Sequence, residues 1–132
     1  MAELRKVSNE YREMALEIVN NVPELADIRT SHDTTIVFLS SDYVKKSQGK
    51  LVFGLTEVVP SKNKWAIDAD FTITIYEENI KDFTEEQKRI LLEHELLHIG
   101  IGKDGKKYVK PHDLEDFRSI IDKYGAYWDE VD

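Results

Sequence analysis

Two histidines and a glutamate in one short segment have the residue types and the spacing of a metal site. In the segment His94-Glu95-Leu96-Leu97-His98 the imidazoles stand four positions apart, and in an α-helix that spacing places both rings on one face. Neutral imidazole nitrogens suit a borderline ion such as zinc. A vacant coordination position holds a water molecule whose pKa falls to about 7, and the neighbouring Glu95 carboxylate could accept its proton. The segment therefore predicts hydrolysis by metal-activated water.

This HExxH pattern, typical of zinc peptidases, lies in a segment with the signals of a helix. Thr84 and Gln87 have the spacing of a capping box, and Gly100 and Gly102 are expected to end the helix. The motif face is flanked by two apolar groups, which consist of Leu92, Leu96 and Ile99 and of Ile90, Leu97 and Ile101. The opposite side is charged and carries Glu86, Arg89 and Glu93. Core on both sides of the motif indicates the floor of a cleft rather than two histidines with a structural role.

Two histidines are an incomplete site, because a catalytic zinc ion generally has three protein ligands and one open position. We expect His112 to be the third ligand: it follows His98 after 13 intervening residues, at the start of the next predicted helix. Asp116 could then bind the second ring nitrogen of His112 and fix its tautomer. Alternatively, Asp113 or Asp116 is itself the ligand. Both aspartates could also serve the N-terminus of that helix, as N-cap and first-turn acid.

Hydrophobic periodicity predicts the elements that position these residues. A first helix has an apolar stripe that consists of Tyr11, Met14, Ala15, Ile18, Val19 and Val22. Pro23 predicts a short second helix or a bend over 23–26. Strands are expected at 34–39, 51–59 and 71–76. A last helix that ends at Gly125 has a stripe of Leu114, Phe117, Ile121 and Tyr124, and Trp128 is expected to pack back on the body.

Two further segments have alternative interpretations. The strand at 71–76 alternates apolar and hydroxyl-bearing side chains; at a sheet edge it could offer backbone groups to an extended peptide, and otherwise it is an ordinary half-exposed strand. The lysine-rich segment 103–110 could attract an acidic substrate segment or form a solvated loop or short hairpin. Candidate donors for an oxyanion are Tyr76, Tyr108 and His32, the last in a polar turn.

Length and composition limit the class of protein. The chain has 132 residues, no cysteine and a formal net charge of -8, so we expect a single domain over 1–132 without disulfides or cysteine-based zinc sites. The acidic balance argues against general nucleic-acid binding. The sequence shows neither a signal peptide nor an apolar run long enough for a membrane span, which predicts a protein without a membrane partner.

From about Val52 to Trp128 the sequence resembles the phage metallopeptidase family, a branch of the zincin-like group. The resemblance rests on three motifs, namely the strand 70–76, the helix 93–99, and Pro111-His112-Asp113-Leu114-Glu115-Asp116-Phe117 followed by Lys123-Tyr124-Gly125. It implies His94 and His98 as metal ligands, Glu95 as general base, and a site completed from the 112–116 region. It also implies a phage or prophage origin and a bacterial cytoplasm. The metzincin pattern HExxHxxGxxH is not present.

The sequence therefore predicts an α+β, zincin-like fold with an N-terminal helix, a small twisted sheet of three or more strands, the HExxH helix packed on the sheet, and a C-terminal helix. The predicted function is peptide-bond hydrolysis with one zinc ion per chain and a peptide or protein substrate. One alternative is a non-catalytic metal-binding module that acts on a host protein. Others are a metal-dependent hydrolase of a non-peptide substrate and a plain structural domain. The sequence does not predict the oligomeric state.

Overall fold

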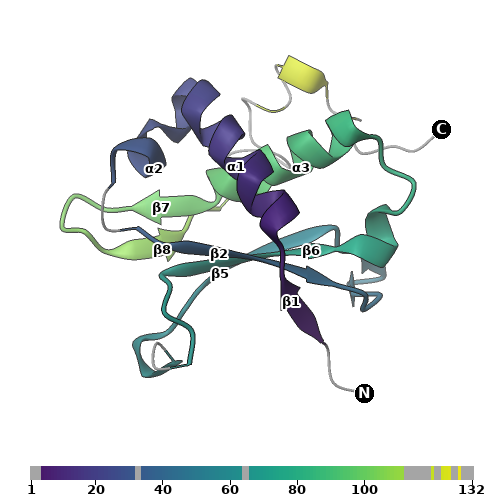
Figure 1. Cartoon of the computed structure of the whole chain (residues 1–132), viewed down its shortest axis with the longest axis horizontal. Coiled ribbons are helices and arrows are strands. Elements are labelled where there is room, and N and C mark those ends of the chain that lie inside the picture. The colour runs from purple at the N-terminus through teal and green to yellow at the C-terminus, as the bar shows by residue number, and fades with distance from the viewer. Residues whose placement is uncertain are drawn as a thin grey trace.

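A computed structural model of the chain describes residues 4–31, 34–63, 66–111, 120, 123–125 and 128. In these residues the protein is α+β, with three α-helices and a small mixed sheet (Figure 1). The helices are α1 (Asn9–Asn21), α2 (Ala26–Thr30) and α3 (Glu85–Leu97). Short 3₁₀ turns occur at Pro23–Leu25, Ser61–Asn63 and Glu77–Ile80. The segment that follows Pro23 is therefore a short helix, as its sequence predicts.

The main sheet contains four strands in the order β1-β2-β6-β5. Their bounds are β1 Arg5–Val7, β2 Ile36–Ser41, β6 Phe71–Tyr76 and β5 Gly54–Val58. β2 and β6 are parallel, whereas β1–β2 and β5–β6 are antiparallel. Two hairpins flank the sheet: β3 (Lys46–Ser47) pairs with β4 (Lys50–Leu51), and β7 (Ile99–Ile101) pairs with β8 (Lys107–Val109). The three predicted strands are confirmed, and β1 is a further strand that the sequence analysis does not predict.

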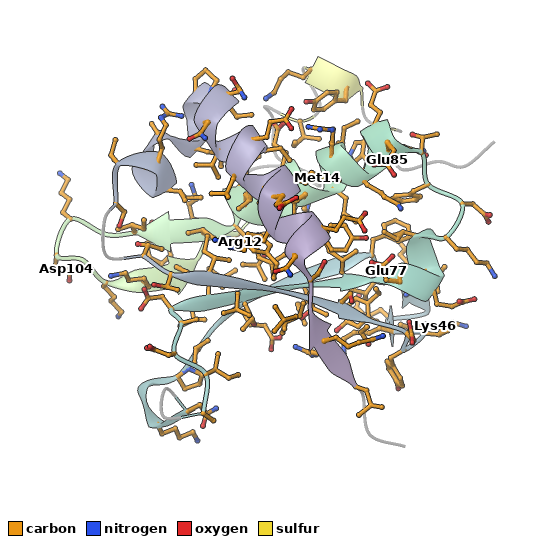
Figure 2. All side chains as sticks on the ribbon, in the orientation of Figure 1. Arg12, Met14, Lys46, Glu77, Glu85 and Asp104 are labelled. Atoms are coloured by element: carbon orange, nitrogen blue, oxygen red, sulfur yellow. The ribbon has the colours of Figure 1, made fainter. Side chains whose placement is uncertain are left out.

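All three helices lie on one side of the sheet (Figure 1), and the core fills the space between the two layers (Figure 2). Three alternate residues of β6, Phe71, Ile73 and Ile75, belong to one apolar cluster with Leu92 and Leu96 of α3. From α1, the predicted stripe contributes its buried members Tyr11, Met14, Ala15 and Ile18. The two-layer arrangement places the motif helix directly on the sheet.

The prediction that 71–76 could be an edge strand is wrong. β6 lies between β2 and β5, and each of its six residues is buried. Its hydroxyl-bearing face is covered by the Arg5 side chain, which donates hydrogen bonds to Thr74 Oγ1 at 3.2 Å and to the Tyr76 hydroxyl at 3.4 Å. Alternation in the sequence shows which face of the strand is polar, but a long arginine side chain that reaches across the sheet, here from β1 past β2, can bury that polar face. Within the described residues, β5 is an edge strand instead.

The motif helix begins as predicted and ends earlier than predicted. Thr84 and Gln87 form a capping box, with Thr84 Oγ1 accepting from Gln87 N at 3.1 Å and Gln87 Oε1 accepting from Thr84 N at 2.8 Å. The last helical residue is Leu97 and His98 is the C-cap, so the expected stop at Gly100 and Gly102 is wrong. Gly100 lies in β7, where a Cβ would approach the Tyr108 ring to 2.5 Å. The missing side chain of Gly100 therefore leaves space for the Tyr108 ring on the opposite strand of the hairpin, and it does not serve to end the helix.

The C-terminal helix is described only in part. Ile120, Lys123 and Tyr124 are helical, and Gly125 follows with a φ of 85°, which agrees with the predicted stop. Leu114, Phe117 and Ile121 lie outside the described residues. No helix in the described ranges is long and apolar enough to cross a membrane.

Candidate metal centre

The last turn of α3 brings His94, Glu95 and His98 together. Each offers one ligand atom, and these atoms all lie within 4.8 Å of one another. The two imidazole rings are 5.2 Å apart between centroids and tilted by 69°. Glu95 is buried and both histidines are partly buried. Two partly exposed imidazoles beside a buried carboxylate could hold a metal ion at the surface of the helix layer.

The β7–β8 hairpin orients His98. The ring Nδ1 of His98 lies 2.6 Å from the carbonyl oxygen of Lys110, and the backbone N–H of Lys110 donates to the His98 carbonyl at 2.6 Å. A carbonyl oxygen only accepts hydrogen bonds, so Nδ1 must carry the proton. In the neutral imidazole the lone pair then lies on Nε2. Metal-binding histidines typically donate their second N–H to a backbone carbonyl in this way, so the His98 arrangement fits a metal ligand.

An aromatic wall lies beside His94. The His94 ring is 6.2 Å from the Trp128 ring, Trp128 is 6.5 Å from Phe83, and Phe83 is 5.1 Å from Phe53, all between centroids. The backbone of Trp128 also accepts a hydrogen bond from Gln87 Nε2 at 3.2 Å. The expectation that Trp128 packs back on the body is therefore confirmed, and its place is next to the motif.

Glu95 is bonded to the sheet. The hydroxyl of Thr56 on β5 lies 2.8 Å from Glu95 Oε1 and 2.9 Å from the Glu95 carbonyl oxygen. The second carboxylate oxygen, Oε2, lies 3.9 Å from His94 Nε2. One oxygen of the carboxylate is thus anchored and the other is directed toward the imidazole.

Glu93 is buried, although the helical projection placed it on a charged outer side. Its carboxylate contacts Lys123 Nζ at 2.5 Å and accepts a hydrogen bond from the Tyr124 hydroxyl at 3.0 Å. Lys123 and Tyr124 contact this side of α3, and Lys123 supplies the charge that a buried carboxylate needs. Burial, together with the charge and hydrogen bond of Glu93, raises the pKa of Tyr124 to about 12.

The other candidates have different outcomes. His112, Asp113 and Asp116 lie outside the described residues, as does His32. Tyr76 is wrong as an oxyanion donor, because its hydroxyl accepts from Arg5 on the sheet face away from the helices. Tyr108 lies against Gly100 in the β7–β8 hairpin.

The lysine-rich segment 103–110 forms the turn and second strand of this hairpin, with Asp104 at its tip (Figure 2). The short-hairpin interpretation of that segment is therefore confirmed.

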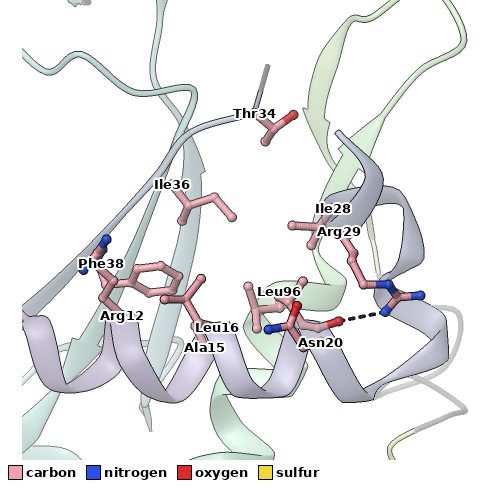
Figure 3. A pocket seen from close by; sticks show the side chains of 11 residues that line it. Arg12, Ala15, Leu16, Asn20, Ile28, Arg29, Thr34, Ile36, Phe38 and Leu96 are labelled. Atoms are coloured by element: carbon pink, nitrogen blue, oxygen red, sulfur yellow. Dashed lines mark hydrogen bonds between the residues drawn. The ribbon is translucent and has the colours of Figure 1, made fainter. Parts of the chain in front are cut away.

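A separate apolar hollow of about 270 Å³ lies between α1, α2 and β2 (Figure 3). Leu16, Ile28, Ile36 and Phe38 line it, and at its rim Arg29 donates a hydrogen bond to the Val19 carbonyl at 2.8 Å. None of the three clustered motif residues lines this hollow.

Three contributors to the site escaped the sequence analysis. The Lys110 carbonyl is a backbone group, which every residue has, so the residue type at position 110 does not indicate its role. Thr56 is one of several threonines in the predicted strands, and nothing in its local sequence distinguishes it. It reaches Glu95 only because β5 packs against α3 in the folded chain. Glu93 immediately precedes the motif, but its ion pair with Lys123 spans 30 positions.

Fold and site define an α+β protein with a candidate metal centre at the end of a sheet-packed helix. A family model described as "Putative phage metallopeptidase" matches residues 5–132, and the chain belongs to this family. No curated protein and no solved structure matched the chain. The family description points to a metallopeptidase with protein or peptide substrates, and the cluster of His94, Glu95 and His98 could bind the metal.

Proposed function

We propose that the chain is a zinc-dependent metallopeptidase of phage or prophage type, with Glu95 as general base. The observation that carries this proposal is the His94, Glu95 and His98 cluster, in which the contact of Nδ1 with the Lys110 carbonyl leaves the lone pair of the neutral His98 ring on Nε2. The family supports a metal and a peptide substrate. We further propose a single zincin-like domain that acts in the bacterial cytoplasm.

Zinc suits this donor set, because two imidazoles and no thiolate are available. We propose His94 and His98 as two ligands and His112 as the third. The contact of Lys110 with the His98 ring supports this choice, since it brings the chain to the ring two residues before His112. Asp116 would fix the tautomer of His112, and Asp113 or Asp116 is the alternative ligand.

The bound zinc ion would polarise the scissile carbonyl and lower the pKa of a water molecule. We propose Oε2 of Glu95 as the atom that takes the proton of that water, because this oxygen lies toward the imidazole of His94, 3.9 Å from Nε2, whereas Oε1 is held by Thr56. Glu95 would then pass the proton to the leaving amine. Its buried position strengthens these electrostatic interactions relative to bulk water.

We propose that the outer edge of β5 receives an extended peptide. The Phe53 carbonyl accepts from the backbone of Tyr76 in β6, and the Val59 N–H donates to Asp70, the residue before β6. In an antiparallel ladder the alternate residues Gly54, Thr56 and Val58 turn their N–H and C=O groups to the other side. No described strand pairs with β5 there. A substrate strand could add to this edge beside Glu95.

The first test is the metal content of tag-free protein by elemental mass spectrometry, with His112→Ala beside the wild type. About one zinc ion per wild-type chain, reduced in the variant, would support the three-histidine site. Unchanged zinc in His112→Ala would transfer the ligand role to Asp113 or Asp116. Less than about a tenth of an equivalent after zinc is offered would refute the metal site, because a formed three-ligand site retains its ion.

The second test separates peptide hydrolysis from other functions. Wild type and Glu95→Gln are incubated with a quenched-fluorescent peptide library and with a panel of oligonucleotides. Cleavage of peptides that is lost in Glu95→Gln at equal zinc content supports the proposal. Cleavage confined to oligonucleotides would indicate a non-peptide hydrolase. Stoichiometric zinc without any turnover would indicate a non-catalytic binding module.

A further inference from the structure

The Glu95 carboxylate is controlled from β5 as well as from its own helix. Thr56 Oγ1 is within hydrogen-bond distance of both Oε1 and the backbone oxygen of Glu95. Thr56 and Glu95 are both buried, with exposed fractions of 6% and 5%. A hydroxyl has one proton to donate, and a bond to a charged carboxylate is stronger than one to a carbonyl. The hydroxyl therefore favours Oε1 and anchors that oxygen.

Gly54 contacts the same carboxylate from the same strand. A Cβ at position 54 would lie 3.0 Å from Glu95 Cγ, 3.1 Å from Cδ and 3.2 Å from Oε2. Gly54 does not have the positive φ that Gly49, Gly105 and Gly125 show, so its backbone conformation is open to other residues. The need for glycine here is space, and the space is occupied by the Glu95 side chain.

The register of the sheet explains why these two residues act together. Gly54 is opposite Ile75 and Thr56 is opposite Ile73, and both isoleucines point into the core under α3. Gly54 and Thr56 therefore face the helix layer as consecutive inward positions of β5. β5 thus contacts Glu95 at two positions on the same face, with the hydroxyl of Thr56 at one and the missing side chain of Gly54 at the other.

We infer that Thr56 and Gly54 are positioning residues that set the direction of the Glu95 carboxylate. Thr56 anchors Oε1, and Gly54 lets the side chain adopt the orientation in which Oε2 lies 3.9 Å from His94 Nε2. The purpose of this orientation rests on the proposed function, in which Oε2 takes the proton of the attacking water. The orientation itself is a property of the protein that can be measured without a substrate.

The test compares three variants with the wild type. Thr56→Val removes the hydroxyl and keeps the shape, Thr56→Ser keeps the hydroxyl, and Gly54→Ala adds the Cβ with the hydroxyl in place. Thr72→Val is the matched control, because Thr72 is a buried threonine of the adjacent β6 whose side chain faces away from the helices. Each protein is analysed for zinc content, for the Glu95 side-chain orientation by crystallography, and for kcat and KM on a quenched-fluorescent peptide cleaved by the wild type.

In Thr56→Val we expect zinc content and KM to stay within about twofold of wild type while kcat falls about 10- to 100-fold, because the reacting group is misplaced rather than removed. Thr56→Ser should restore kcat, Gly54→Ala should lower it with a displaced carboxylate, and Thr72→Val should leave it unchanged. A kcat in Thr56→Val equal to wild type, with the carboxylate in its original place, would overturn the inference. A folding failure of Thr56→Val leaves the decision to Gly54→Ala.

The two proposals can fail separately. If the wild type binds zinc and cleaves no peptide, the proposed peptidase function fails, and the crystal structures still decide the positioning. If the Glu95 carboxylate then stays in place in both Thr56→Val and Gly54→Ala, the inference that Thr56 and Gly54 position it is overturned. A carboxylate that moves in these two variants and keeps its place in Thr56→Ser and Thr72→Val supports it.

Discussion

The ammonium nitrogen of Lys123 lies 2.5 Å from Oε2 of Glu93, a carboxylate buried on the motif helix. The Tyr124 hydroxyl donates to the other oxygen of the same carboxylate at 3.0 Å. Glu93 immediately precedes His94, whereas Lys123 and Tyr124 belong to the C-terminal segment. These two contacts therefore hold Lys123 and Tyr124 against the helix that carries the candidate metal ligands.

The two halves of this pair should contribute unequally to stability. Lys123→Met leaves a buried carboxylate with only the Tyr124 hydroxyl as a described donor, and we expect a loss of about 2 kcal/mol in the free energy of unfolding. Glu93→Gln should cost less than about 1 kcal/mol, because glutamine still accepts hydrogen bonds and the one-third exposed Lys123 can reach solvent. Urea denaturation of both variants at pH 7 measures the difference. An equal or larger loss in Glu93→Gln would contradict this assignment.

Tyr124 should make stability depend on pH in the alkaline range. Its pKa is raised to about 12 by burial and by Glu93, whereas in the unfolded chain it is about 10. The folded state therefore favours the neutral phenol. This contribution to stability is complete below about pH 10 and is lost as the pH rises toward 12.

The measurement is the melting temperature of wild type and Tyr124→Phe between pH 9 and 12. We expect the wild type to lose stability more steeply than the variant, because phenylalanine has no proton to lose. Burial and the neighbouring Glu77 also raise the pKa of Tyr11, so a residual decline should persist in Tyr124→Phe. Parallel curves for the two proteins would show that Tyr124 titrates normally.

Local patterns were sufficient for the elements that carry the motif. The capping box at Thr84 and Gln87 depends on two residues three positions apart, and the stripe of α1 depends on helical periodicity, so both were predictable. The motif itself gave the His94, Glu95 and His98 cluster, because a helix fixes the relative positions of residues four apart.

Contacts between distant segments could not be predicted in this way. The burial of Glu93 depends on Lys123, and the anchoring of Glu95 depends on the pairing of β5 with β6. The early end of α3 depends on pairing between Ile99–Ile101 and a strand that begins at Lys107. From local sequence a glycine after a helix predicts the helix end. In the structure Gly100 instead provides the space that the Tyr108 ring of the partner strand occupies.

Gly100→Ala should strain the β7–β8 hairpin. The new Cβ would lie 2.5 Å from the Tyr108 ring, so the ring must move. Tyr108 is 42% exposed and can turn outward, which limits the expected loss in the free energy of unfolding to about 1–2 kcal/mol. A double-mutant cycle with Tyr108→Ala measures the clash directly, because the cost of Gly100→Ala should largely disappear in the Tyr108→Ala background. The same cost in both backgrounds would place its origin in the backbone.

Metal should stabilise the folded chain through both clustered histidines. Zinc that binds only the native state at 100 times its dissociation constant adds about 2.7 kcal/mol to the free energy of unfolding. We expect added zinc to raise the melting temperature and a chelator to reverse the rise. His94→Ala and His98→Ala should lose this response, because each removes a ligand nitrogen. Glu95→Gln is the matched control, since the proposed role of Glu95 is proton transfer and its zinc response should stay. A zinc response that survives in His98→Ala would show that the metal binds elsewhere, and would remove the structural reason for the hydrogen bond between the His98 ring and Lys110.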